Sequence, residues 1–213
     1  MMLKIYGDSI SGNCLKVRWL LDKLGINHAW IETDIMTGGS RTPDFLALNP
    51  AGQVPLAVLA DGRPLAQSNA ILIHFGEGTD WIPANSYERA RMLEWMFWEQ
   101  YSHEPYIAVA RFQRLYLRRS GDEVEPRIME RGRAALERME AALDGRGWLV
   151  GNGASLADIA LVAYTRMAGD GGFDLEGYPA IRAWITRVEA ALGIGPYESE
   201  SASSSSVPAA SRA

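Results

Sequence analysis

The first eighty residues alternate between short apolar runs and segments whose apolar positions recur at helical spacing. Short apolar runs bounded by polar or turn residues are typical of buried strands. These runs are residues 3–6, 28–32, 56–60 and 64–66. Helical spacing occurs in three further segments, residues 14–24, 42–48 and 70–75. This part of the chain is therefore predicted to fold in the order βαβαββα.

From residue 86 onward the apolar positions follow helical spacing alone. The predicted helices are residues 86–119, 125–143, a segment that starts at 155, and 178–193. We expect Pro105 to kink the first of them, because proline lacks the N–H that an interior helix position donates. Ser155 and Asp158 have the spacing of a capping box, in which the two residues satisfy each other's backbone N–H groups. The second part is therefore predicted to be entirely helical.

Glycine and polar residues separate the two parts, and a Ser- and Ala-rich tail ends the sequence. The tail has too few large apolar side chains to offset the entropy lost on ordering. The predicted organisation is an α/β domain at residues 1–77, a linker at 78–85, an all-helical domain at 86–195 and a disordered tail at 196–213.

Composition narrows the classes of function. The chain has 213 residues, 47% of them hydrophobic, and a net charge of −5, which argues against a nucleic-acid partner. Residues 1–4 lead into the first strand without a signal peptide, and no apolar run could span a bilayer, so we expect a cytoplasmic protein without a membrane partner. The single cysteine, Cys14, excludes an intramolecular disulfide, and the three scattered histidines predict no metal site.

Val54-Pro55 stands at the entrance to the third predicted strand. Proline there is typical of a cis bond in a tight turn, which would leave the N–H and C=O of Val54 free to pair with another peptide backbone. Ser68 is expected to cap a helix whose N-terminal amides and partial positive charge suit a carboxylate. Together these features predict a receptor for a small extended peptide with an acidic end.

Several segments in the right order make the chain resemble the cytosolic glutathione transferase family. They are residues 11–18, residues 49–55 with Val54-Pro55 at their end, Gln67-Ser68, Ser155 with Asp158, and residues 178–184. The resemblance covers residues 3 to about 195 and is to bacterial, theta- and beta-like members of the serine type. It implies a thioredoxin-like domain followed by an all-helical domain, glutathione as co-substrate, and a homodimer.

The resemblance also implies a hydroxyl that favours the thiolate of glutathione by donating a hydrogen bond to the sulfur. Ser11 occupies the position of the serine in the Ser-x-Pro-Cys segment of theta- and delta-like members, and Asn13 stands in place of its proline. Ser11 and Asn13 are therefore both assigned to catalysis. Ser9 and Tyr6 are the alternative hydroxyls, and a simple helix cap is the alternative role for Ser11. Cys14 is interpreted as a small buried hydrophobe, which disfavours an omega-like enzyme with a cysteine nucleophile.

Glutathione contacts follow from the same resemblance. The Val54 backbone would pair with the cysteinyl unit, and Gln67 and Ser68 would hold the γ-glutamyl group. Gln53 stands where theta-like members often have lysine, and Arg41 is either a replacement for that charge or a solvated loop residue. The residues assigned to glutathione binding are Arg41, Gln53, Val54, Pro55, Gln67 and Ser68.

A pocket for the electrophile is expected between residues 9–12 and the long helix. Glu104, Ala108 and Arg111 share a face of that helix and are assigned to substrate binding. Four aromatic residues nearby are interpreted as core or dimer packing: Trp95, Trp98, Tyr101 and Phe112. No role is assigned to His103.

The function implied is conjugation of glutathione to small hydrophobic electrophiles, as in detoxification. A glutathione-dependent disulfide reductase or peroxidase is the alternative enzyme, since it would use the same thiolate. A non-catalytic binding protein on the same fold is the alternative of another class. The presence of Ser11, Gln67 and Ser68 favours an enzyme, because these residues serve little purpose without the ligand.

Overall fold

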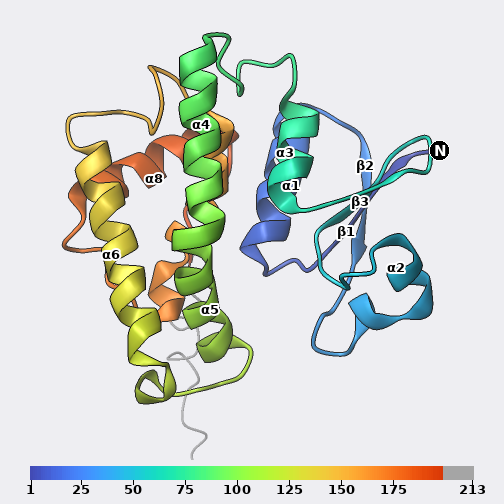
Figure 1. The fold of residues 1–213 in the computed structure, drawn as a ribbon, viewed down its shortest axis with the longest axis horizontal. Helices are drawn as coiled ribbons and strands as arrows, with labels where there is room; N and C mark the ends of the chain where they lie inside the picture. The colour runs from blue at the N-terminus through green and yellow to red at the C-terminus, as the bar shows by residue number, and fades with distance from the viewer. Residues whose placement is uncertain (199–213) are drawn as a thin grey trace, which may run out of the picture.

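The computed structural model describes residues 1–198, in which a mixed sheet with three helices packs beside a helical part (Figure 1). The strands and helices of the first part are β1 (Leu3–Gly7), α1 (Gly12–Lys23), β2 (His28–Glu32), α2 (Pro43–Leu48), β3 (Leu56–Val58), β4 (Pro64–Ala66) and α3 (Ser68–Gly76). The helices of the second part are α4 (Ser86–Trp98), α5 (Glu104–Leu115), α6 (Pro126–Leu143), α7 (Leu156–Thr165) and α8 (Pro179–Leu192).

The four strands form one sheet in the order β2-β1-β3-β4. β1 runs parallel to β2 and antiparallel to β3, and β3 is antiparallel to β4. Since β1 is central, its residues Leu3 and Ile5 are buried, as are Leu56 and Ala57 of β3. The predicted βαβαββα order and the thioredoxin-like plus all-helical fold are confirmed.

Two helix starts in the first part differ from the prediction. α1 begins at Gly12, two residues earlier than its apolar spacing indicated, because Gly12 and Asn13 are not apolar. α3 begins at Ser68 itself, so Ser68 is its first residue and not its cap. Gln67 occupies the cap position and makes no side-chain cap bond, so the predicted capping by Ser68 is wrong.

The long helix predicted at 86–119 is interrupted by a π-helix over Glu99–His103, between α4 and α5. Pro105 lies in the first turn of α5, where its missing N–H leaves no hydrogen bond unmade. The break therefore precedes the proline. Single π turns inside α-helices are frequent at functional sites.

The predicted capping box at the start of α7 is present. The Ser155 N–H and hydroxyl both donate to Asp158 Oδ2, at 2.8 and 2.9 Å. Asp158 is fully buried, and its other oxygen accepts from Trp184 Nε1 of α8 at 2.7 Å and from Leu149 N at 3.1 Å. Every residue of α7 is buried, so this helix forms the centre of the helical part.

The predicted domain boundaries at 77/78 and 85/86 stay predictions. Most of the predicted tail, from residue 199 onward, lies outside the described residues. Within residues 1–198 no helix is both long enough and apolar enough to cross a membrane.

Candidate functional site

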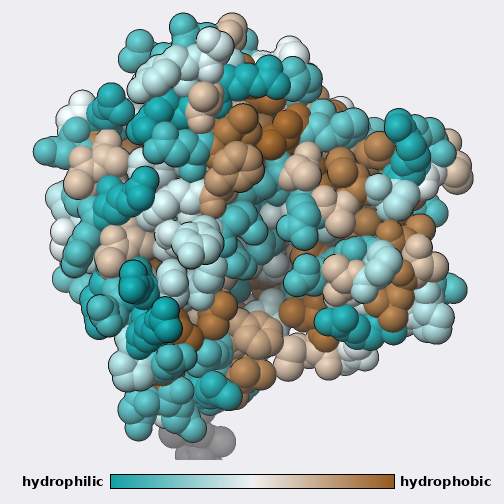
Figure 2. Space-filling model, viewed as in Figure 1, coloured by the Kyte–Doolittle hydropathy of each residue, from teal (hydrophilic) through white to brown (hydrophobic). Residues whose placement is uncertain are grey.

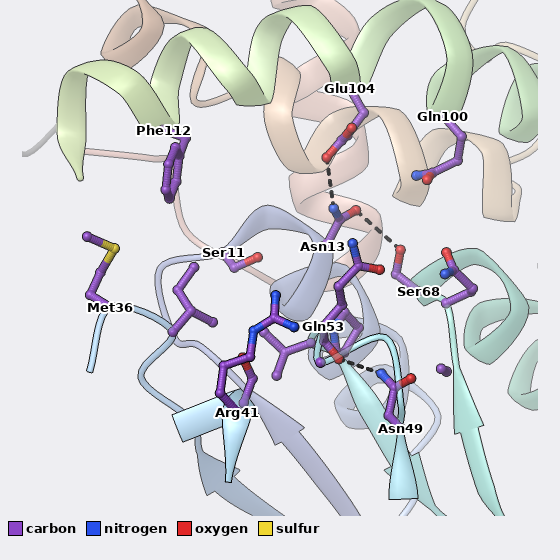
Figure 3. Close-up of a pocket in the computed structure, with 17 residues that line it drawn as sticks. Ser11, Asn13, Met36, Arg41, Asn49, Gln53, Ser68, Gln100, Glu104 and Phe112 are labelled. Carbon is purple, nitrogen blue, oxygen red and sulfur yellow. Dashed lines mark hydrogen bonds between the residues drawn. The ribbon is translucent and has the colours of Figure 1, made fainter. Parts of the chain in front are cut away.

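A hollow of about 530 Å³ lies between the sheet part and the π-helix with α5, and we call it the main cavity because most of the predicted site residues line it (Figures 2 and 3). Nine of the predicted site residues line it: Ser11, Asn13, Arg41, Gln53, Val54, Pro55, Gln67, Ser68 and Glu104. Ala108 and Arg111 do not line it. The loops that follow β1 and β2 and precede β3 and α3 thus converge on one site.

Ser11 is the cap residue of α1, yet its side chain makes no cap hydrogen bond. Its backbone C=O accepts from the N–H groups of Cys14 and Leu15, at 3.0 and 2.9 Å. A Cβ at Gly12 would come within 2.9 Å of the Tyr164 ring, so glycine lets α1 start against α7. The hydroxyl of Ser11 is therefore not committed to capping.

The alternative hydroxyls lie outside the main cavity. The Ser9 hydroxyl donates to Glu32 Oε2, and its N–H donates to Glu32 Oε1 at 2.9 Å. The Tyr6 ring packs edge-on against Phe45. Cys14 is fully buried, and burial raises the pKa of its thiol to about 12. This environment agrees with the structural interpretation of Cys14, because a reactive thiol needs an accessible thiolate.

Asn13 connects the two sides of the cavity (Figure 3). Its Oδ1 accepts from the Ser68 hydroxyl at 3.2 Å, and its Nδ2 donates to Glu104 Oε1 at 3.2 Å. The two bonds fix the orientation of the amide, since one end must accept and the other donate. Asn13 therefore holds α3 and α5 in register around the site.

The loop before β3 presents the backbone of Val54 to the cavity. The Val54-Pro55 bond is cis. The buried Asn49 side chain orders this loop, because its Nδ2 donates to Gln53 O at 2.8 Å and its Oδ1 accepts from Ala51 N at 3.3 Å. Among residues 1–198, neither the N–H nor the C=O of Val54 bonds to another backbone group. An extended peptide could therefore pair with Val54.

Gln67 has a left-handed backbone, with φ of 70° and ψ of 112°. Such a conformation costs a non-glycine residue roughly 1–3 kcal/mol, and residues of this kind cluster at ligand sites. Gln67 and the buried Ser68 both line the cavity where α3 begins. This corner suits a carboxylate, as the sequence indicated.

Arg41 also reaches the cavity. Its Nη1 donates to Ala51 O at 3.3 Å, and its guanidinium lies over Gly52, where a Cβ would meet Nη1 at 2.3 Å. Arg41 and Gln53 border the same side of the cavity in Figure 3. The cation is thus beside a ligand space, although it is also exposed to solvent.

Arg111 has a different position from the one expected. Its side chain is 3% exposed and pairs with Asp170, Nε to Oδ2, at 3.0 Å. Its Nη1 donates to Ile10 O at 2.8 Å, and Tyr116 of the turn after α5 donates to Asp8 Oδ2 at 3.2 Å. Arg111 therefore positions the loop before Ser11 and does not face the cavity.

The sequence missed several lining residues. They are Ile35, Met36, Ser40, Asn49, Gly52, Ala66, Gln100 and Phe112. Figure 3 shows Met36 and Phe112 together beyond Ser11, while Gln100 lies at the opposite end near Ser68. The cavity therefore has an apolar end and a polar end, and Phe112 is not merely core packing. Only the apolar character of Met36 and Phe112 could have signalled this.

Glu104 is the titratable group with the most perturbed surroundings in the cavity. Burial raises the pKa of its carboxyl, and the Glu99 carboxylate acts in the same direction. Lys16 and the hydrogen bond from Asn13 act in the opposite direction. Perturbed titratable groups in a cleft are candidates for proton transfer.

Two family models match this chain, those of the glutathione S-transferase N-terminal domain over residues 10–77 and C-terminal domain over residues 98–191. A solved structure of a glutathione S-transferase from Xanthobacter autotrophicus Py2 is 47% identical, with a TM-score of 0.85 over 92% of this chain and 96% of that chain. Glutathione S-transferase 3 of Zea mays is 32% identical over 165 residues, which are 73% of each protein. Disulfide-bond oxidoreductase YfcG of Escherichia coli is 29% identical over 195 residues, 84% of this chain and 87% of that protein.

Proposed function

Because this chain belongs to the cytosolic glutathione transferase family, we propose that it binds glutathione in the main cavity and conjugates it to small apolar electrophiles. The similar proteins are named glutathione S-transferases and a disulfide-bond oxidoreductase, and both family models are of glutathione S-transferase domains. One observation carries the proposal: a serine hydroxyl free of helix capping shares a cavity with an unpaired backbone segment at Val54.

Glutathione would lie across the cavity as an extended peptide. Val54 would pair with the cysteinyl backbone, as one strand adds to another. Gln67 and Ser68 would receive the γ-glutamyl carboxylate at the start of α3, where N–H groups and the helix dipole favour an anion. Arg41 and Gln53 would face the glycyl carboxylate. This placement uses both charged ends and the central amide of the ligand.

The sulfur would then lie near Ser11. A hydroxyl that donates to sulfur stabilises the thiolate relative to the thiol, and the N-terminus of α1 acts in the same direction. The thiolate is the nucleophile, so this contact raises the fraction of glutathione that can react at neutral pH. Asn13 would position the site through its bonds to Ser68 and Glu104.

The electrophile would occupy the apolar end of the cavity. Met36 and Phe112 lie on the far side of Ser11 from Ser68 in Figure 3, with Ile35 also in the lining. Holding an apolar substrate against the thiolate contributes by orientation as well as by affinity. This set replaces Ala108 and Arg111, while Glu104 keeps a place in the proposed site.

Disulfide reduction is a second candidate, favoured by the similarity to the Escherichia coli protein named a disulfide-bond oxidoreductase. The only cysteine of this chain, Cys14, is fully buried. Thiol–disulfide exchange would therefore have to run through the thiol of glutathione, activated at Ser11 as for conjugation. A panel of aryl halide, hydroperoxide and mixed-disulfide substrates separates these activities.

We also propose a homodimer. Phe97 and Tyr101, in α4 and the π-helix, are 69% and 84% exposed. Figure 2 shows hydrophobic side chains gathered where α4 and α3 face each other. Exposed apolar surface of this kind is typical of an interface. Phe97→Glu should shift the protein toward monomer in sedimentation, and an unchanged sedimentation profile would argue against this interface.

The deciding experiment is an ultraviolet titration of enzyme-bound thiolate. Ser11→Ala should raise the pKa of bound glutathione by about one to two units, since a hydrogen bond to a charged acceptor contributes roughly 1.5–3 kcal/mol. Ser9→Ala, Tyr6→Phe and Cys14→Ala are matched controls that should leave it unchanged. A shift in Ser9→Ala alone would mean the wrong serine was assigned. Absence of glutathione binding by the wild type would favour a non-catalytic protein on this fold.

A further inference from the structure

We propose that Tyr197 and Asp170 are positioning residues for Ser11. They act through Arg111, so the segment that follows α8, residues 193–197, controls how much of the bound glutathione is thiolate. This inference rests on the proposed function, because it concerns the regulation of the same serine. It makes the end of the described chain necessary for the site, although this segment does not touch the ligand.

The peptide group that joins Ile10 to Ser11 is held from two sides. Its N–H donates to Asp8 O at 3.1 Å, and its C=O accepts from Arg111 Nη1 at 2.8 Å. Because a peptide group is planar, these two bonds fix the orientation of the whole unit. The C=O of Ser11 in turn accepts from the first N–H groups of α1. The backbone of Ser11 is therefore fixed on both sides, and its hydroxyl moves only by rotation between staggered χ1 positions.

Two groups from the end of the helical part hold the Arg111 guanidinium in this orientation. Asp170, in the 3₁₀-helix over Ala168–Gly171, accepts from Arg111 Nε at 3.0 Å. The Tyr197 hydroxyl donates to the same Asp170 oxygen at 2.5 Å and lies 3.5 Å from Arg111 Nη2. The side chains of Arg111 and Asp170 are each 3% exposed, so little water competes for these bonds. The three guanidinium nitrogens thus have three different partners, which fixes the planar group.

Other contacts hold the segment after α8 independently of the Tyr197 hydroxyl. The chain leaves α8 at Gly193, whose φ of 74° favours glycine. Arg166, at the end of α7, donates from Nη2 to Gly195 O at 2.7 Å. Its guanidinium carbon lies 5.6 Å from the centre of the Tyr197 ring and 5.2 Å from that of Trp19 in α1. The hydroxyl can therefore be removed while the ring and the segment keep their places.

Loosening the guanidinium of Arg111 has a specific chemical consequence. The peptide group between Ile10 and Ser11 gains freedom to turn, so the serine hydroxyl is aimed at the sulfur for a smaller fraction of the time. The pKa of the bound thiol then rises toward that of free glutathione, because the thiolate loses part of its hydrogen bond. The contacts proposed for the two charged ends of glutathione lie outside this network. Thiolate formation should therefore change while binding of the ligand does not.

The test is the ultraviolet titration of bound thiolate in Tyr197→Phe, which removes the hydroxyl and keeps the ring beside Arg166. The pKa of the bound thiol should rise by about half a unit to one unit, a part of the shift expected for Ser11→Ala. Turnover should fall about threefold to tenfold below the wild-type pKa, and it should recover at high pH, where the thiol ionises unaided. Tyr178→Phe, at the other end of α8, is the matched control and should change neither readout.

A double variant shows whether the effect passes through Ser11. With Ser11→Ala in place there is no hydroxyl to aim, so Tyr197→Phe should add no further shift of the thiol pKa. Affinity for S-methylglutathione, which has no thiol to ionise, should stay within about twofold of the wild type. Asp170→Asn should behave in the same way as Tyr197→Phe, with a larger shift, because it removes the charge that pairs with Arg111.

An unchanged thiol pKa in Tyr197→Phe would overturn the proposal. So would an equal shift of the pKa in the Ser11→Ala background, or clearly weaker binding of S-methylglutathione, because the segment after α8 would then act on the site as a whole. Failure of the proposed function is distinguishable, since the wild type itself would then form no bound thiolate.

Discussion

Lys16 of α1 and Glu99 of the π-helix form an ion pair in which both side chains are 0% exposed, with Nζ 3.5 Å from Oε1. Glu99 Oε2 also accepts from Asn69 of α3 at 3.0 Å and from Gln100 at 2.7 Å. The pair thus joins the sheet part to the helical part directly behind the cavity, and Gln100 lines the cavity itself.

Replacing one partner of this pair should be strongly destabilising. Lys16→Met leaves Glu99 buried without its cation, and such changes cost about 3–5 kcal/mol. The measurement is the free energy of urea unfolding. Arg91→Met is the control, because Arg91 pairs with Glu94 on the surface and exposed pairs contribute about 0–1 kcal/mol. A similar small effect of Lys16→Met would show that solvent reaches Glu99 readily. The double variant Lys16→Met/Glu99→Leu should recover much of the loss.

Stability should fall in acid through His103. This residue is fully buried, its Nε2 lies 2.9 Å from Thr165 Oγ1, and its Nδ1 has no partner among the described residues. Burial lowers its pKa from 6.5 to about 4. As the pH falls from 6.5 toward 4, the unfolded chain takes up a proton that the folded protein does not, so stability is lost. At about 1.4 kcal/mol per pKa unit the full loss is roughly 3 kcal/mol.

Urea unfolding at a series of pH values checks this expectation. His103→Gln should reduce the loss of stability between pH 6.5 and 4, whatever its effect on stability at neutral pH. His74→Gln, which changes an exposed histidine of α3, should lose as much stability between pH 6.5 and 4 as the wild type does. If His103→Gln also loses as much, other groups cause the acid sensitivity.

Asp158 should contribute far more to stability than an exposed capping residue. Asp158→Ala leaves the buried Trp184 Nε1 and two backbone N–H groups without acceptors, and each buried unsatisfied donor costs about 1–3 kcal/mol. We expect a total near 3–5 kcal/mol in thermal or urea unfolding. Glu123→Ala removes the matching cap residue from an exposed 3₁₀ turn and should cost about 1 kcal/mol or less. Equal costs would contradict the central role of α7.

Glutathione affinity should depend on Ser68. Its hydroxyl donates to Asn13 Oδ1 in the free protein and would turn to the γ-glutamyl carboxylate in the complex, where a hydrogen bond to a charged group contributes about 1.5–3 kcal/mol. Ser68→Ala should therefore weaken binding about ten- to a hundredfold in calorimetry. Ser9→Ala is the control, since Ser9 bonds to Glu32 outside the cavity. Unchanged affinity in Ser68→Ala would place the γ-glutamyl group elsewhere.

The sequence by itself determined most of the elements and half of the site. Apolar spacing is a local property of the sequence. The first and last residues of β2 and β4 were therefore predicted as observed, and those of α6 and α8 to within one residue. Val54-Pro55 indicated a turn with a cis bond, and Gln67-Ser68 indicated the start of a helix, from the residue types alone. Both pairs line the cavity. These predictions needed no knowledge of distant contacts.

Tertiary structure decided which side chains of the long helix face the cavity. Spacing counted from Glu104 along α5 suggested Ala108 and Arg111, while Gln100 of the π-helix and Phe112 of α5 line the cavity. Arg111 is instead bound by Asp170 and by the C=O of Ile10, which are 59 and 101 residues away in the chain. Asn13 finds its partners 55 and 91 residues away, at Ser68 and Glu104. Contacts at that separation depend on how the two parts dock, which the local pattern does not encode.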